Sequence, residues 1–143
     1  MKNFNFPIKL KYREKTVKTP LSALEIFQKI EQKYPLSVFL ESMEKDFNEA
    51  RYSTICFSPY IHIAAKDDFL IIDGEEEKVE NPYNELKKIT KKLQQKLTKQ
   101  KLPGGFCGGL IGYLSYEATK YFEPAFKGKK NKDFFDFEFG LYL

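Results

Sequence analysis

The side chains of this 143-residue chain that could do chemistry are few and scattered. His62 is the one histidine, and Cys56 and Cys107 lie far apart, so we expect neither a zinc site nor a disulfide framework. A lone histidine in a strand-like segment is typical of a structural or surface residue. The acidic residues 75–77 follow an Asp-Gly pair, and we interpret them as solvated turn residues without a role in cation binding.

The glycine-rich residues 104–112 lack the patterns of nucleotide-binding loops. These residues contain neither GxGxxG nor GxxxxGK[ST], nor a Lys followed by Ser or Thr that could hold phosphate and magnesium. Three glycines within five positions, Gly108, Gly109 and Gly112, interrupt an apolar run. They indicate either a bulge in a strand or the close approach of another backbone or a ligand.

Lysine clusters at two places account for the formal net charge of +4. Apolar residues recur at three- and four-residue steps within residues 86–97, and lysines between 87 and 101 fill the remaining arc. This pattern predicts an amphipathic helix with a basic face. Residues 127–132 hold four more lysines without apolar periodicity, which is typical of an exposed loop. A small basic nucleic-acid-binding module is the alternative function that these two clusters raise.

Composition favours one soluble globular domain. A hydrophobic fraction of 42%, with 14 Phe and 9 Tyr, supplies large apolar side chains for a core. No apolar run approaches the roughly 18 residues that span a bilayer, and residues 1–6 lack the pattern of a signal peptide. We therefore expect a cytoplasmic protein without a membrane partner.

Strands and helices must alternate to position these groups. Period-two alternation predicts a strand at residues 8–12. A helical stripe predicts a helix that Thr19 caps, that begins at Pro20 and that stops before Pro35. Apolar and β-branched segments predict further strands at residues 36–42, 51–58, 60–65, 69–72, 106–116 and 137–143. The expected fold class is α+β, with a mostly antiparallel sheet and two main helices.

Three motifs, taken in chain order, resemble one enzyme family. They are LES at 40–42, ARYS at 50–53 followed by an apolar strand, and GGLIGYLSYE at 108–117 with Lys120 beyond. Together they resemble the N-terminal region of anthranilate synthase component I, and the resemblance covers nearly the whole chain. Aminodeoxychorismate synthase component I, of the folate pathway, shares the architecture and a similar glycine motif, and it remains an alternative.

The resemblance implies a role in tryptophan biosynthesis. Proteins of this family are carbon–oxygen lyases that convert chorismate, with ammonia or glutamine, into anthranilate and pyruvate. A chorismate-binding catalytic domain that uses magnesium, and a glutamine amidotransferase component, are the implied partners. The family's catalytic residues and metal ligands lie in that domain, so none is expected in this chain, which alone should be inactive. Residues 1–143 would be an N-terminal regulatory domain, part of a larger sandwich shared with the missing catalytic domain.

The resemblance further implies a feedback pocket for tryptophan, shared with the catalytic domain. A free amino acid needs an acceptor for its ammonium, donors for its carboxylate and an apolar cleft for its side chain. We expect Glu41 to attract the ammonium, and Ser42 and Ser53 to donate to the carboxylate. Leu40 and Tyr52 would flank the indole.

Other positions in the matched motifs allow two interpretations. Arg51 belongs to the tryptophan pocket, or it pairs with Glu41 across neighbouring strands. The catalytic domain packs closely on the glycine segment, or the glycines form a bulge within the sheet of this domain; the positions concerned are Gly108, Gly109, Gly112 and Tyr113. Tyr113 and Tyr116 are expected to be packing residues in either case. Lys120 stands where the family commonly has Arg, which puts a salt bridge there in doubt.

Overall fold

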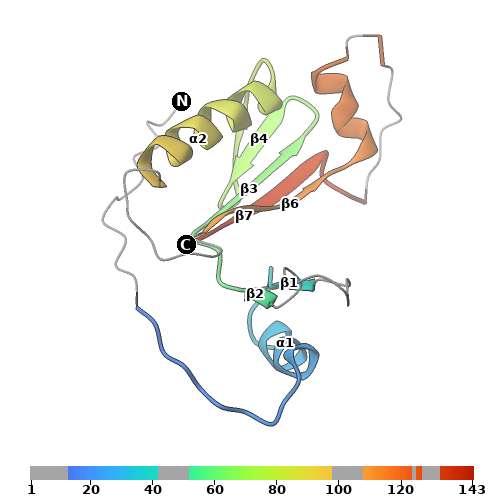
Figure 1. The fold of residues 1–143 in the computed structure, drawn as a ribbon. Coiled ribbons are helices and arrows are strands. Elements are labelled where there is room, and N and C mark those ends of the chain that lie inside the picture. The colour runs from blue at the N-terminus through green and yellow to red at the C-terminus, as the bar shows by residue number, and fades with distance from the viewer. Residues whose placement is uncertain (1–12, 42–51, 98–107, 124, 127–132) are drawn as a thin grey trace, which may run out of the picture.

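Two antiparallel sheets and three helices make up the described part of the chain, which confirms the α+β class (Figure 1). The computed structural model describes residues 13–41, 52–97, 108–123, 125–126 and 133–143. The strand expected at 8–12 and the basic loop at 127–132 lie outside these ranges. No helix within them has the length and apolar character needed to cross a membrane.

Helix α1 spans Ala23–Glu31 and is capped by Ser22. The Ser22 Oγ accepts a hydrogen bond from the Glu25 N–H, and a Glu25 carboxylate oxygen accepts one from the Ser22 N–H at 2.8 Å. The predicted start at Thr19 and Pro20 was wrong, because this reciprocal pair satisfies two helix-end donors three residues later. The Thr19 hydroxyl instead accepts a hydrogen bond from the Leu21 N–H.

A two-stranded sheet follows α1 and packs against it. Strands β1 (Val38–Glu41) and β2 (Ser53–Cys56) confirm the two strands predicted here and pair antiparallel. Both are shorter than the predicted ranges, 36–42 and 51–58. The ring of Phe27 in α1 stacks on Phe39 in β1, with centroids 5.3 Å apart. Figure 1 shows this α1 and β1–β2 unit as a lobe below the larger sheet.

The larger sheet has five strands, all paired antiparallel, in the order β5-β4-β3-β7-β6. Its strands are β3 (Ile61–Lys66), β4 (Phe69–Ile72), β5 (Glu75–Lys78), β6 (Gly109–Leu114) and β7 (Phe137–Tyr142). Strand β7 is the last in the chain, yet it lies between β3 and β6. The predicted strands at these places are confirmed, except that β5 was not foreseen.

Strand β5 corrects the interpretation of residues 75–77 as turn residues. Asp73 and Gly74 both have positive φ angles, 49° and 84°, and form the two-residue turn that joins β4 to β5. Asp-Gly is a favoured sequence for such hairpin turns. All four residues of β5 are exposed, so a strongly acidic sequence is tolerated at this sheet edge.

Helix α2 (Pro82–Leu97) covers one face of the larger sheet (Figure 1). Leu86, Ile89 and Leu93 of α2 are buried there, which confirms the predicted amphipathic helix. The sheet side of this core consists of Ile61, Ile63, Ala65, Leu70, Phe137 and Leu141. Asn81 caps α2, because its Oδ1 accepts hydrogen bonds from the N–H groups of Tyr83 and Asn84.

A short 3-10 helix, η1 (Tyr116–Tyr121), connects β6 to the segment before β7 and was not predicted. Tyr116 at its start is 76% exposed, so it packs little within this chain, and its packing on another domain stays a prediction. Its ring meets only the edge of the neighbouring Phe126 ring among the aromatic contacts described, with centroids 5.2 Å apart. Tyr113 in β6 is 37% exposed.

Candidate functional site

The positions implied for tryptophan binding lie on the β1–β2 hairpin. Glu41 stands directly opposite Ser53, and the Ser53 hydroxyl donates to Glu41 Oε1 at 3.4 Å. Tyr52 precedes β2 and is 81% exposed. Ser42 and Arg51 lie outside the described residues, so neither their place nor a pair between Arg51 and Glu41 is defined.

The hairpin divides the described positions between its two faces. Adjacent residues in a strand point to opposite faces, so Leu40 and Glu41 are separated. Phe39 shares the Glu41 face and stacks on Phe27 of α1. Glu41 and Ser53 therefore lie on the face that α1 covers, whereas Leu40, 46% exposed, lies on the other face opposite Thr54.

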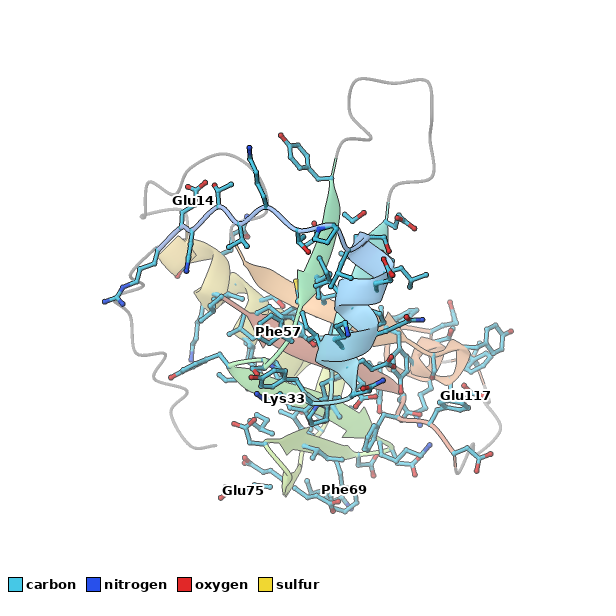
Figure 2. The ribbon with its side chains drawn as sticks, turned by 90° about the horizontal axis from the view of Figure 1, so that it is seen from below. Glu14, Lys33, Phe57, Phe69, Glu75 and Glu117 are labelled. Carbon is cyan, nitrogen blue, oxygen red and sulfur yellow. The ribbon has the colours of Figure 1, made fainter. Side chains whose placement is uncertain are left out.

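Contacts from both ends of the hairpin hold this lobe to the rest of the molecule. The Tyr142 hydroxyl of β7 donates to the Leu36 carbonyl before β1. The Tyr60 N–H, after β2, donates to the Leu141 carbonyl at 2.7 Å. Phe57 packs against the ring of Tyr34, and Figure 2 shows Phe57 beside the end of α1. The hairpin is thus anchored to the last strand of the sheet.

A charged network forms where β7 begins, away from the hairpin. Asp136 is 1% exposed, and its Oδ2 lies 2.8 Å from the Lys120 ammonium of η1. Lys120 also lies 3.0 Å from Asp67 Oδ1, in the turn between β3 and β4. The Asp67 N–H donates to Asp136 Oδ2 at 2.7 Å, and the Tyr121 hydroxyl lies 2.7 Å from the same oxygen. Three segments distant in sequence therefore meet on one carboxylate.

Lys120 forms the salt bridge that its replacement of Arg had put in doubt. The two carboxylates approach it from different segments, so the planar fork of Arg is not required. An ammonium with three rotatable donors can serve Asp136 and Asp67 separately. The sequence pattern gave no indication of Asp136 or Tyr121 as partners, because they are close to Lys120 and Asp67 only in the folded chain.

The network shifts the pKa values of its members in the directions that favour their native charges. Burial alone would raise the pKa of Asp136, but hydrogen bonds from Lys120, Tyr121 and the Asp67 N–H outweigh it and hold that pKa below its ordinary 3.8. Burial alone would lower the pKa of Lys120, but Asp136 and Asp67 hold it above its ordinary 10.5. Burial, and then the hydrogen bond to Asp136, raise the pKa of Tyr121.

A second polar group lies on the face of the sheet opposite α2. His62 Nε2 is 2.8 Å from Glu138 Oε1, and both side chains are about one quarter or less exposed. Phe135 presents its edge to the His62 ring. Burial, followed by the hydrogen bond to Glu138, raises the pKa of Tyr113. His62 thus has a structural partner on the neighbouring strand.

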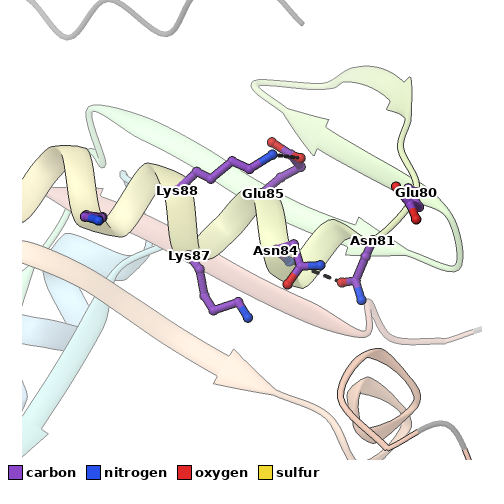
Figure 3. Close-up of a pocket in the computed structure, with 7 residues that line it drawn as sticks. Glu80, Asn81, Asn84, Glu85, Lys87 and Lys88 are labelled. Carbon is purple, nitrogen blue, oxygen red and sulfur yellow. Dashed lines mark hydrogen bonds and ion pairs between the residues drawn. The ribbon is translucent and has the colours of Figure 1, made fainter.

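The first turns of α2 line an open hollow of about 370 Å³ (Figure 3). Its lining side chains are polar or charged: Glu80, Asn81, Asn84, Glu85, Lys87, Lys88 and Lys91. Glu85 pairs with Lys88 at 2.7 Å, and the Lys87 ammonium lies 5.2 Å from the centroid of the Tyr83 ring. Part of the basic face is therefore neutralised locally, and the alternative of nucleic-acid binding stays untested.

The comparisons with known proteins point to one enzyme. The chain is 39% identical, over 94% of its length, to "Anthranilate synthase component 1" of Methanothermobacter marburgensis. It is 39% identical over 83% of its length to that of Methanothermobacter thermautotrophicus, and 35% over 96% to that of Leptospira biflexa. This chain is related to the N-terminal part of anthranilate synthase component 1. No family model matches it, and no solved structure matches it.

The chain spans about a quarter of the length of these anthranilate synthase components: 26%, 25% and 28%. Such coverage fits the expectation that the fold is one part of a larger protein.

The matched region includes the glycine segment, where contacts with β7 leave no space for a side chain at two of the glycines. A Cβ at Gly112 would lie 1.9 Å from the Glu138 carbonyl oxygen, and one at Gly108 would lie 2.7 Å from that of Tyr142.

Proposed function

We propose that this chain is the N-terminal portion of an anthranilate synthase component 1 that contributes a feedback pocket for tryptophan. The observation that carries the proposal is the 39% identity over 94% of the chain. The order of the LES, ARYS and GGLIGY motifs supports it. Conversion of chorismate to anthranilate, and partnership with a glutamine amidotransferase, are proposed for the longer protein and not for this chain alone.

The proposal places catalysis and magnesium in a chorismate-binding domain that packs on this one. Within the described ranges, no three His, Cys, Asp or Glu side chains gather as metal ligands. Because the family resemblance places the magnesium ligands in that domain, we propose no residue of this chain as one. Packing against the catalytic domain is proposed to involve Gly109 and Tyr113 of β6, besides the glycines already in contact with β7.

The proposed pocket is formed by the β1–β2 hairpin together with the catalytic domain. The residues proposed for it are Leu40, Glu41, Ser42, Arg51, Tyr52 and Ser53, with Leu40 on the face of the hairpin opposite to Glu41 and Ser53. We propose that the indole lies on the Leu40 face, because α1 already covers the other face at Phe39. Tryptophan bound there would favour a less active state of the enzyme, which couples this site to the chorismate site.

Replacing Leu40 by Ala in the longer enzyme should weaken feedback inhibition. Apolar contact supplies much of the binding free energy of an indole, so the tryptophan concentration for half-inhibition should rise by roughly tenfold. The measurement is anthranilate formation, followed by its fluorescence, at increasing tryptophan concentration. Ser53→Ala, on the α1 face, should have the smaller effect.

Leu24→Ala is the matched control, because Leu24 in α1 is 50% exposed, close to the 46% of Leu40, and is outside the proposed pocket. It should leave inhibition unchanged. If Leu40→Ala and Ser42→Ala both leave inhibition unchanged, the pocket is not at this hairpin. Direct binding to the 143-residue chain can be followed by indole fluorescence, because this chain contains no Trp.

A further inference from the structure

The β1–β2 hairpin is bounded by two residues whose backbone conformation is unusual. Leu36, before β1, has a φ angle of 60°, and Ser58, after β2, has a φ angle of 52°. Residues other than glycine seldom adopt positive φ angles, because the Cβ then crowds the backbone. Such conformations persist only where neighbouring contacts hold them. The hairpin therefore has a strained joint at each end, and each joint depends on its surroundings.

Both joints are attached to consecutive residues of β7. The Leu141 carbonyl accepts a hydrogen bond at 2.7 Å from the Tyr60 N–H, which lies just beyond Ser58. The Leu36 carbonyl accepts a hydrogen bond from the Tyr142 hydroxyl. Figure 1 shows the end of β7 next to the segment that leaves β2. The end of one strand thus holds both ends of the hairpin.

The Tyr142 side chain is built into the sheet as well as into the joint. It is 6% exposed, and a Cβ at Gly140 would lie 2.7 Å from its Cε2 and 2.8 Å from its Oη. The ring therefore lies over Gly140, where the missing side chain leaves room for it. Burial raises the pKa of Tyr142, and the nearby Cys56 and Glu138 add to this effect. The hydroxyl thus stays protonated and able to donate.

The register of β7 relates this ring to both neighbouring strands. Tyr142 pairs with Gly109 of β6, and Gly140 pairs with Ile111 of β6 and with His62 of β3. Strand β6 is the strand proposed to pack on the catalytic domain. The residue that holds the hairpin joint is therefore a direct neighbour of that strand.

We infer that Tyr142 is a positioning residue that clamps the β1–β2 hairpin to the sheet and relays the effect of a ligand on the hairpin to β7 and β6. Without the clamp, the hairpin rotates as one piece about its joints at Leu36 and Ser58. The hairpin carries the proposed tryptophan pocket, so this inference rests on the proposed function. Feedback inhibition through the sheet requires that the hairpin be firmly attached to it.

Amide hydrogen exchange in the 143-residue chain tests the clamp without tryptophan. Tyr142→Phe removes the hydroxyl and keeps the ring. The Tyr60 amide, which reports attachment to β7, should exchange about three to ten times faster, as expected for the loss of one hydrogen bond. The amides that pair β1 with β2 should change by less than about twofold, because the hairpin moves without opening.

Tyr121→Phe is the matched control, because it also removes a tyrosine hydroxyl that lies 2.7 Å from a backbone carbonyl, that of Asp67. Tyr121 belongs to η1 and has no contact with the hairpin joints among the hydrogen bonds described. This variant should not accelerate exchange of the Tyr60 amide relative to the amides that pair β1 with β2. A general loss of stability is thereby separated from release of the hairpin.

Gly140→Ala tests the same clamp from the side of the sheet. The three atoms nearest to its new Cβ all belong to the Tyr142 side chain, so the ring must leave its place over β7. Exchange of the Tyr60 amide should rise as it does in Tyr142→Phe. Adding Tyr142→Phe to Gly140→Ala should have little further effect, because the hydroxyl no longer reaches Leu36.

Two exchange results would overturn the clamp. Unchanged exchange of the Tyr60 amide in Tyr142→Phe would show that the hydroxyl does not hold the hairpin. Equal acceleration of the Tyr60 amide and of the amides that pair β1 with β2 would show local unfolding of the hairpin in place of rotation about its joints.

Residual activity of the longer enzyme at saturating tryptophan tests the relay. Tyr142→Phe should raise this residual activity by at least about threefold and change the activity without tryptophan little, whereas Tyr121→Phe should alter neither. Residual activity equal to that of the parent would overturn the role in feedback. If the parent enzyme does not bind tryptophan, the proposed function fails instead, and the exchange results still decide whether Tyr142 clamps the hairpin.

Discussion

Replacing Asp136 by Asn should lower the free energy of unfolding by about 3–5 kcal/mol, the cost typical of removing one partner from a buried ion pair. The change leaves the Lys120 ammonium without its closest carboxylate, 2.8 Å away, and removes the acceptor shared by Tyr121 and the Asp67 N–H. Urea denaturation followed by far-ultraviolet circular dichroism measures the effect. Asp68→Asn is the control, because the Asp68 side chain is well exposed and its ion pair with Lys78 is long, at 4.0 Å.

A comparison with Lys120→Met and the double variant would separate the charge pair from its surroundings. The double variant should lower the free energy of unfolding by less than the sum of the two single variants, because it leaves no unpaired buried charge. An Asp136→Asn protein that unfolds at the same urea concentration as the parent would contradict this account of the network.

The same network predicts how stability depends on pH. The pKa of Asp136 is held below its unfolded value of 3.8, so its contribution is present above that pH and is lost as pH falls through the folded pKa. The pKa of Lys120 is raised above 10.5, so its contribution is present below that pH and is lost as pH rises through the folded pKa. The network's contribution should therefore be constant from about pH 5 to pH 9, and Asp136→Asn should remove the acid-side loss.

Replacing Gly112 by Ala should destabilise the fold by about 3 kcal/mol or more, at the upper end of what overpacking costs. The new Cβ would lie 1.9 Å from the Glu138 carbonyl oxygen and 2.7 Å from the Cα of Phe139. Both neighbours are backbone atoms of β7, so the two strands would have to separate. Urea denaturation measures this loss as well.

Gly74→Ala is the matched comparison for this substitution. Gly74 has a φ angle of 84°, but a Cβ there would meet nothing within 4 Å. Gly74→Ala should therefore lower the free energy of unfolding by only about 1–2 kcal/mol, the penalty for an alanine in the left-handed region. If Gly112→Ala proves no worse than Gly74→Ala, close contact with β7 is not what requires glycine at position 112.

Local patterns predicted the elements whose signal is contained in a short segment. Helix α2 follows from the spacing of Leu86, Ile89 and Leu93, and the β3–β4 hairpin follows from two apolar runs about a short polar turn. The start of α1 was misplaced because Thr19-Pro20 and Ser22 with Glu25 are competing cap signals, and only the second is reciprocal. Strand β5 was missed because three consecutive glutamates have a low strand propensity.

The site was less predictable, because its members come together only in the folded chain. The motifs located the hairpin, but they put in doubt a salt bridge at Lys120 that the structure contains. They did not show that neighbouring residues of LES point to opposite faces, which follows from the observed register of Leu40 with Thr54. Asp136 lies in a segment rich in phenylalanine, and its partners are found only through tertiary contacts.

The position of β7 between β3 and β6 has a consequence for the way the protein is made. His62 and Glu138, in contact across β3 and β7, are 76 positions apart in the chain. During synthesis from the N-terminus, β3, β4 and β5 emerge as a hairpin meander. Neither β3 nor β6 can pair with β7 until β7 has been synthesised. Nascent chains should therefore expose two unpaired strand edges until β7 leaves the ribosome, a period in which chaperone binding would prevent aggregation.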